Sequence, residues 1–340
     1  MRRLLFAAFF GTAACRPEGA STTPDPFAAQ PYDTAPPSPR AKVFLVAGGD
    51  DIANFAAEVL EQRTLWRRAG LREDEIACYF AKPTTQALRE DAEQYAALAL
   101  ALRSCRAATP ERLFTDLRAA ARDAEGFVYL FVTSHGLASQ LRPLETSQNP
   151  RTQRFVASLG PDERDALEPA AVGLDAGAGP RLGDSRAVVA ALREGRSAEQ
   201  TIVSPRTLAP VLEAFPPEVE KIVVLQACFS GGFIDHHARR RADPSPGADA
   251  LLAVPNLTVL TATAAERPSF GCGSGAARTY FGGAFNVALE RALAEHPPRA
   301  LPWEDIHHRV SFAIEAMEAV AGQRASHPGF VSPRMARPRP

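Results

Sequence analysis

A histidine and a cysteine each stand directly after a run of apolar residues, in the segments Gly126–Ser134 and Lys221–Ala227. Both runs are typical of central strands, and parallel strands present their carboxyl ends at one sheet edge, where α/β proteins bind ligands. His135 and Cys228 are therefore expected to lie close together. An imidazole can take the proton of a thiol and later protonate a leaving amine. The pair predicts thiol-dependent acyl transfer with Cys228 as nucleophile and His135 as base.

Glycine and other small residues follow both candidate residues. Gly136 lets the backbone approach a substrate closely, so its N–H group could stabilise an oxyanion together with the N–H group of Cys228. Ser230 and the two glycines after it leave space beside the thiol. The alternative interpretations are a buried structural thiol and a histidine that only binds a main-chain carbonyl.

The elements that must position these residues alternate along the chain. Strands are expected at 42–47, 76–80, 126–134, 221–227 and 257–261, and helices at 54–69, 85–106, from 110 onward, at 278–295 and at 303–320. Thr109 followed by Pro110 is a typical helix start. Strands that alternate with helices predict an α/β fold with a mostly parallel sheet and helices on both faces.

Composition limits the class of protein. The chain has 340 residues, 38 Lys and Arg against 39 Asp and Glu, and 46% hydrophobic residues. These values exclude a polytopic membrane protein, a wholly disordered chain and a nucleic-acid binder that relies on a basic surface. Nucleic acid is therefore not an expected partner.

The stretch 138–203, between the third and fourth expected strands, is much longer than a crossover requires. It is rich in Gly, Pro, Asp and Arg, and one helix is expected at 183–195. A connection of this kind is functional or poorly ordered. It is interpreted as an insertion, a lid or a tether, and it is expected to be the first region cut by an added protease.

The N-terminus is typical of an exported protein. Residues 1–15 combine a basic start, a short apolar run and Cys15, which resembles the lipidated cysteine of bacterial lipoproteins, although an ordinary signal peptide is the alternative. Residues 16–40 predict a disordered tether and 334–340 a tail. Outside the cytoplasm, Cys78 and Cys105 could pair as a disulfide.

The motifs together resemble caspase-like cysteine peptidases, and most closely the bacterial members of the legumain-like family C13. In a caspase, Arg, Gln or Gly follows Gln-Ala-Cys, where this chain has Phe229. The matching segments occur in family order over about 41–333: Val46-Ala47-Gly48, Ala108-Thr109, Thr133-Ser134-His135-Gly136, Ala227-Cys228-Phe229-Ser230-Gly231-Gly232, Glu266-Arg267-Pro268-Ser269-Phe270-Gly271-Cys272 and Thr279-Tyr280-Phe281-Gly282. The resemblance implies a caspase-like domain with a His135–Cys228 dyad, here separated by 93 residues because of the insertion.

The resemblance also implies roles for other residues. Asn54 falls where some members orient the histidine, although a helix N-cap is the alternative, and Cys272 is expected to shape its loop without reacting. The resemblance implies that legumain recognises Asn through charged residues at three positions. This chain has the uncharged residues Ala56, Gln226 and Gly283 there, so broader selectivity for uncharged residues is expected. The residues expected to contact substrate are Gln226, Ser230, Ser269 and Phe270.

Cofactor chemistry is not expected. The pairs His236-His237 and His307-His308 have no Cys, Asp or Glu at zinc spacing, and they are interpreted as surface or helix-face residues. Asp50 and Asp51 follow Gly48-Gly49 and are interpreted as turn residues rather than as cation ligands. No metal or other cofactor is therefore predicted.

The sequence as a whole predicts a cysteine endopeptidase that acts on peptides or proteins through a thioester acyl-enzyme. It is expected in the bacterial cell envelope, on the periplasmic side, bound to the membrane by the lipid on Cys15. A transpeptidase of the same mechanism is one alternative. The other is a non-enzymatic envelope lipoprotein that uses the fold for binding.

Overall fold

The structure is a computed structural model, and it describes residues 25–28, 32–174, 185–234, 247–272 and 277–333. Its centre is a seven-stranded sheet in the order β3-β2-β1-β4-β7-β8-β9, parallel except for β9. The strands are β1 (Val43–Ala47), β2 (Ile76–Phe80), β3 (Arg106–Ala107), β4 (Phe127–Thr133), β7 (Glu220–Gln226), β8 (Leu257–Thr261) and β9 (Gly329–Val331). The five longest of these were predicted from their apolar runs.

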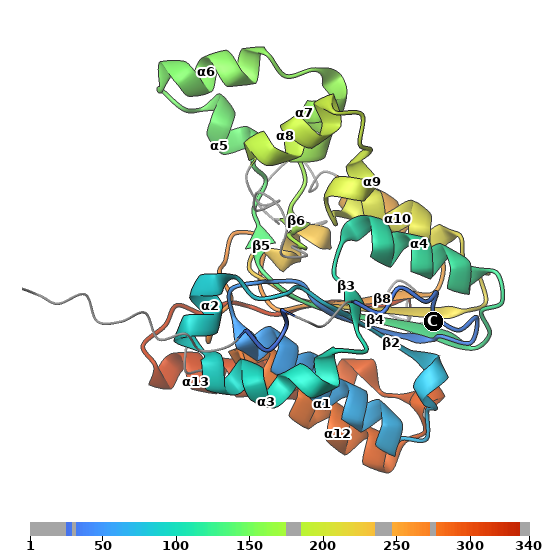
Figure 1. Cartoon of the computed structure of the whole chain (residues 1–340). Coiled ribbons are helices and arrows are strands. Elements are labelled where there is room, and N and C mark those ends of the chain that lie inside the picture. Colours follow the sequence, from blue (N-terminus) through green and yellow to red (C-terminus); the bar gives the residue numbers. More distant parts are fainter. Residues whose placement is uncertain (1–24, 29–31, 175–184, 235–246, 273–276, 334–340) are drawn as a thin grey trace, which may run out of the picture.

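Helices cover both faces of the sheet (Figure 1). One face packs against α1 (Ala53–Arg68), α3 (Ala92–Leu102), α12 (Tyr280–Glu295) and α13 (Trp303–Val320), and the other against α4 (Pro110–Ala121), α10 (Pro205–Glu213) and α11 (Ala248–Leu252). Successive strand residues alternate between the two cores: Phe131 belongs to the first and Val132 to the second. The predicted α/β class, with a mostly parallel sheet between two helical layers, is confirmed.

Local signals fix some helix ends. The Thr109 hydroxyl accepts a hydrogen bond from the N–H group of Arg112, so it caps α4 as predicted. The single helix predicted over 85–106 is instead two helices, α2 (Thr85–Glu90) and α3, because Asp91 leaves the helical conformation with φ −125°. Short 3-10 turns lie at Glu73–Glu75, Ser230–Phe233 and Pro298–Ala300.

The segment before β1 is packed, where a disordered tether was predicted over 16–40. Phe27 is buried, with its ring centroid 5.3 Å from that of Phe80. The Tyr32 hydroxyl accepts the N–H group of Lys82 at 3.0 Å. The prediction is therefore wrong for residues 25–28 and 32–40, because two aromatic side chains can anchor a segment that has no apolar periodicity. Cys15 and residues 334–340 lie outside the described residues.

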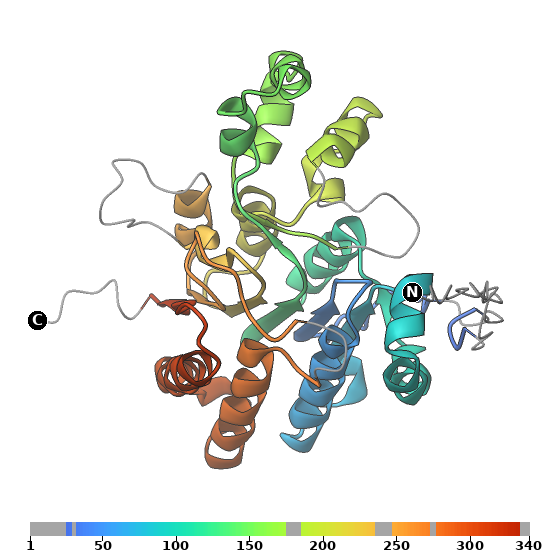
Figure 2. The same cartoon turned by 90° about the vertical axis from the view of Figure 1, so that its left-hand side faces the viewer.

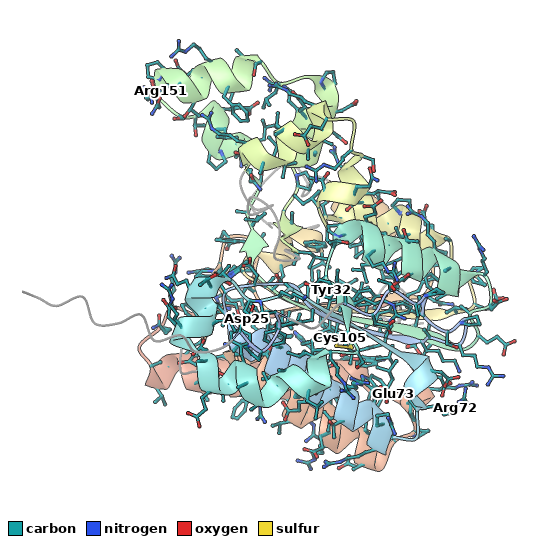
Figure 3. All side chains as sticks on the ribbon, in the orientation of Figure 1. Asp25, Tyr32, Arg72, Glu73, Cys105 and Arg151 are labelled. Atoms are coloured by element: carbon teal, nitrogen blue, oxygen red, sulfur yellow. A yellow bond between two sulfur atoms is a disulfide. The ribbon has the colours of Figure 1, made fainter. Side chains whose placement is uncertain are left out.

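A disulfide joins Cys78 of β2 to Cys105, which directly precedes β3. Figure 3 shows Tyr32 close to Cys105, and the N–H group of Asp33 donates to the Cys105 carbonyl at 3.3 Å. Arg106 donates to the carbonyl of Ala35 at 3.0 Å. The disulfide and the N-terminal segment therefore stabilise the same edge of the sheet.

The insertion after β4 is a small helical subdomain with a core of its own. It contains β5 (Gly136–Leu137), α5 (Leu141–Glu145), α6 (Pro150–Ala157), α7 (Pro161–Leu167), β6 (Ala171–Val172), α8 (Ser185–Arg193) and α9 (Ala198–Thr201). Leu167, Val188 and Ile202 are buried in this core. Figure 2 shows α5–α8 standing away from the sheet, and Figure 3 places Arg151 at the far end. Of these helices only α8 was predicted.

None of the helices in the described ranges has the length and apolar character that a membrane crossing requires.

Candidate active site

His135 lies just beyond the carboxyl end of β4 and is bound by an acid from the β1–α1 loop. Its Nε2 lies 2.6 Å from Oδ1 of Asp51, and the side chains are 44% and 23% exposed. The Phe55 ring meets the imidazole edge-on, with the two centroids 5.4 Å apart. A side chain at Gly49 would collide with Phe55. The loop therefore holds the imidazole in place while leaving part of it accessible to solvent.

The side chain that binds His135 is that of Asp51 and not that of Asn54, which was expected to orient the histidine. Asn54 is fully buried, and its Nδ2 donates to the carbonyl of Gly271 at 3.0 Å. It is not the helix N-cap either, since that position is Ile52. Asn54 belongs to the first turn of α1 and so faces the core, whereas the preceding loop carries Asp51 to the sheet edge. Asp51 was interpreted as a turn residue only.

Cys228 follows β7, the strand next to β4, and lies against the loop before α12. The N–H group of Ser269 donates to its Sγ at 3.3 Å, and Sγ lies 3.8 Å from the Ser269 carbonyl oxygen. Phe229 has a left-handed backbone with φ 58°, and its N–H group donates to the Arg267 carbonyl at 2.8 Å. Two successive residues are thus fixed by main-chain contacts, which leaves the thiol half-buried.

The histidine and cysteine segments meet through their backbones. A Cβ atom at Gly136 would collide with the carbonyl group and the nitrogen of Cys228. The residue before His135 is joined across the sheet edge too, since the N–H group of Ser134 donates to the Gln226 carbonyl at 3.1 Å. His135 and Cys228 therefore leave adjacent strands whose ends are in direct contact, and glycine is required at 136 for steric reasons.

The residues expected to contact substrate divide into two groups. Gln226 and Ser230 are fully buried: Gln226 Oε1 lies 2.7 Å from the Thr133 hydroxyl, and the Ser230 hydroxyl accepts the N–H group of Ala262 at 3.0 Å. Ser230 therefore holds β8 and does not line an open pocket. Ser269 and Phe270 are half-buried in the loop beside Cys228. The Phe270 carbonyl accepts the N–H group of Tyr280, which ties this loop to α12.

The sequence interpretation missed a buried carboxyl group beneath the site. Glu58 of α1 is fully buried and accepts the Thr133 hydroxyl at 2.7 Å and the N–H group of Thr279 at 2.6 Å. Burial raises the pKa of Glu58 from 4.5 to about 7, although both of these hydrogen bonds lower it. A side chain at Gly282 would collide with this carboxyl. The signal available in the sequence was an acid four residues after Asn54, on the same helix face.

Cys272 is a second free thiol near the nucleophile. Desolvation raises the pKa of Cys272 to about 12, and the charges of Cys228, Glu58 and Asp51 act in the same direction, although the residue as a whole is exposed. The carbonyl of Gly271 is held by Asn54, which fixes the backbone just before Cys272. A thiol that stays protonated is a poor nucleophile, so Cys272 suits the loop-shaping role better than a reactive one.

The insertion is attached on both sides of His135. Gly136 pairs with Val172 in the two-stranded β5–β6 sheet, and the N–H group of Gly173 donates to the His135 carbonyl at 3.0 Å. The hydroxyl of Ser134 donates to the carbonyl of Gly173 at 2.5 Å. The backbone of the candidate base is thereby held by the insertion as well as by the sheet.

Within the described ranges, no three His, Cys, Asp or Glu side chains gather as they would around a metal ion. His307 Nε2 lies 3.3 Å from the Pro328 carbonyl and 3.2 Å from the Ser311 hydroxyl, and burial lowers its pKa. His236 and His237 lie outside the described residues.

Comparison with solved structures finds remote likenesses of low similarity. Protein GSU0716 from Geobacter sulfurreducens is 12% identical with a TM-score of 0.43, and the match covers 86% of this chain and 92% of that one. Caspase-1 from Spodoptera frugiperda is 13% identical with a TM-score of 0.41, covering 89% and 90% of the two chains. No protein-family model matches the chain. The curated proteins contain no significant match either.

Proposed function

We propose that this protein is a cysteine peptidase in which Cys228 is the nucleophile and His135 the proton carrier. One observation carries the proposal. The two residues follow adjacent parallel strands whose ends touch through Gly136, and Asp51 binds Nε2 of His135. Because Nε2 is occupied, Nδ1 is the ring nitrogen left to exchange a proton with the thiol. The caspase-like and legumain-like motifs support the same assignment.

The chemistry proceeds in two steps. In the first, His135 takes the Cys228 proton as sulfur attacks the scissile carbonyl carbon, and the imidazolium then gives that proton to the leaving amine as the C–N bond breaks. In the second, His135 takes a proton from the water that attacks the thioester carbonyl, and the imidazolium returns this proton to sulfur as the C–S bond breaks, which releases the acid and the Cys228 thiol. The N–H groups of Gly136 and Cys228 are the proposed oxyanion donors.

Each neighbouring residue has a role in this proposal. Asp51 carries negative charge beside the imidazole, so it stabilises the imidazolium formed between the two proton transfers. Ser269 and Phe270 lie in the loop at the thiol and are the proposed contacts for the substrate. If an amine instead of water attacked the thioester, the same residues would perform transpeptidation.

A thiol-directed, peptide-based activity probe tests the assignment, and the chain supplies its own control. We expect saturable labelling at Cys228 that is lost in Cys228→Ala and at least about tenfold slower in His135→Ala, because the base is missing. Cys272→Ser removes the other free thiol of the described residues and should label at the normal rate. Labelling that persists in Cys228→Ala and disappears in Cys272→Ser would contradict the proposal.

A non-enzymatic binding protein is the second candidate. The observation in its favour is the insertion, whose own core makes it a sizeable subdomain attached beside the site. An intact chain that the probe fails to label, and that cleaves no peptide in a diverse library, would favour this function.

We also propose that the chain is anchored in the bacterial envelope through a lipid on Cys15. The disulfide between Cys78 and Cys105 supports export, since such bonds persist in oxidising compartments. Cys15→Ser should move the protein from the detergent phase to the aqueous phase in phase partitioning, or leave it unprocessed. An unchanged preference for the detergent phase would exclude this anchor.

A further inference from the structure

Three oxygen atoms form a short chain beneath the candidate dyad. The hydroxyl of Thr133 lies 2.7 Å from Oε2 of Glu58 and 2.7 Å from Oε1 of Gln226. All three side chains are fully buried. Thr133 and Gln226 are paired in the register of β4 and β7, and they stand two residues before His135 and Cys228. Any rearrangement in this chain therefore takes place at the base of both candidate catalytic segments.

When Glu58 is charged, these three oxygen atoms have too few hydrogen atoms between them to form both hydrogen bonds. A threonine hydroxyl has one hydrogen, whereas a carboxylate and an amide oxygen are acceptors only. Thr133 could then donate to Glu58 or to Gln226 but not to both. The amide nitrogen of Gln226 meanwhile has no partner among the described residues and is buried. An unmade hydrogen bond of this kind is costly in a protein interior.

Two arrangements satisfy both short contacts. In the first, Glu58 is protonated and donates from Oε2 to Thr133, which donates to Oε1 of Gln226. In the second, Glu58 is ionised and accepts from Thr133, while the Gln226 amide is turned over so that Nε2 donates to Thr133. The two ends of an amide have nearly the same shape, so the turn requires little space. Oε1 of Glu58 accepts the N–H group of Thr279, which places the exchangeable proton on Oε2.

We infer that Glu58 is a positioning residue whose proton sets, through Thr133, which end of the Gln226 amide faces Thr133. The proton is exchanged with solvent, and only the Oε2–H bond forms or breaks. Burial supports this inference, because it raises the pKa of Glu58 to about 7, where both forms are populated near neutral pH. The effect of this proton on activity rests on the proposed peptidase function. Its effect on the orientation of the Gln226 amide does not.

The other ionisable groups around Glu58 are few. On α1, Glu61 raises the Glu58 pKa, and Glu61 is itself bound by Arg278 at 2.8 Å and by the Asn286 amide at 2.7 Å. Cys272 interacts with Glu58 from the loop before α12. Above Thr133, towards the sheet edge, His135 is paired with Asp51. A control for the neighbouring acid on the same helix is therefore Glu61→Gln.

The direct test is the side-chain amide signal of Gln226 in the full chain, labelled with 15N-glutamine and assigned by its absence in Gln226→Met. We expect its chemical shifts to change in one step near pH 7. Glu58→Gln should hold the signal at its low-pH position from pH 5 to 9, because the new amide accepts from Thr279 and donates to Thr133 as the protonated acid does. Glu61→Gln should keep the step.

Thr133→Val provides a second variant, in case Glu58→Gln does not fold. It removes the hydroxyl that links Glu58 to Gln226, and it should abolish the step in the Gln226 signal while leaving Glu58 in place. A step that persists in Glu58→Gln arises from another group and overturns the inference. A wild-type signal that stays constant from pH 5 to 9 does the same.

A second readout uses catalysis. If the protein is a peptidase, kcat should show an ionisation near pH 7 that disappears in Glu58→Gln and remains in Glu61→Gln. Absence of any peptide cleavage would contradict the proposed function alone, and the Gln226 signal would still decide the inference.

Discussion

Asp51 occupies Nε2 of His135, so it determines which ring nitrogen can serve the thiol. Asp51→Asn keeps the shape of the side chain but removes its charge. We expect kcat to fall at least about tenfold with little change in KM, since the imidazolium loses its stabilising charge. Stability should change by less than about 1 kcal/mol, because the pair is partly exposed. Steady-state kinetics and thermal unfolding measure the two effects.

Asn54→Ala is the informative contrast to Asp51→Asn. Its amide holds the Gly271 carbonyl, so its loss should loosen the loop at Cys228 and act on both KM and stability. Normal kcat in Asp51→Asn together with a selective loss of kcat in Asn54→Ala would reverse the assignment and restore the role that the sequence resemblance gave to Asn54.

Glu58 makes stability depend on pH with a definite sign. Its pKa is about 7 in the folded protein and about 4.5 when exposed, so the folded state binds the proton more tightly. The contribution of Glu58 to the free energy of unfolding is therefore fully present below pH 4.5 and is lost as pH rises through 7. The difference corresponds to about 3 kcal/mol as an order of magnitude. Urea unfolding from pH 4.5 to 8.5 should show this decline in the wild type.

Glu58→Gln should flatten that part of the pH profile, because glutamine does not ionise. A decline of equal size in Glu58→Gln would assign the effect to another buried group, for which Asp116 is the next candidate, since burial raises its pKa as well.

The candidate site could be predicted from the sequence only where a strand positioned it. His135 and Cys228 follow long apolar runs, and parallel pairing then places them at one edge. Asp51 comes from a loop, whose path no periodicity determines, and the resemblance had placed its role on Asn54, three residues later. Glu58 was missed because an acid on an amphipathic helix is usually exposed, and only tertiary packing reveals its burial.

At the level of the elements, the pattern of hydrophobic residues predicted the longer strands and several of the helices. The five longest sheet strands and helices such as α1 and α13 were recognised from apolar runs or helical spacing. The short edge strands β3 and β9 were missed because two or three residues carry no pattern. Most of the insertion was missed because its helices are short and charged, and a few buried residues such as Leu167 hold them together.

The core of the insertion leads to a prediction that differs from the one made from composition. Because Phe155 of α6 packs against the core that contains Leu167, Val188 and Ile202, α6 should resist trypsin despite the basic residues Arg151 and Arg154. Leu167→Ala should cost roughly 2–5 kcal/mol in the insertion and expose α6 to cleavage. Limited proteolysis with mass spectrometry locates the cuts.

Leu100→Ala is the matched control, since Leu100 is 68% exposed on α3 and its truncation should change nothing. Rapid cutting within α6 of the wild type would show that the core of the insertion is too weak to protect it.

At the scale of the whole molecule, the N-terminal segment covers one edge of the sheet. Phe27 packs on Phe80 and Tyr95, Arg106 holds the carbonyl of Ala35, and the disulfide lies within the same edge. The edge strand β3 has only two residues, so few hydrogen bonds to β2 hold it in the sheet. If Cys15 carries the proposed lipid, the packed residues 25–28 and 32–40 are part of the connection between that lipid and the domain.

Reduction of the disulfide should destabilise this edge. The bridge closes a loop of 27 residues, and chain entropy for that length gives about 3.5 kcal/mol. We expect a reductant to lower the urea midpoint of the wild type and to speed proteolysis before residue 40, because the Cys105 carbonyl also binds Asp33. The double variant Cys78→Ala and Cys105→Ala should have the low midpoint with or without reductant. If the reductant shifts its midpoint as well, the effect belongs to another cysteine, and the edge does not depend on the disulfide.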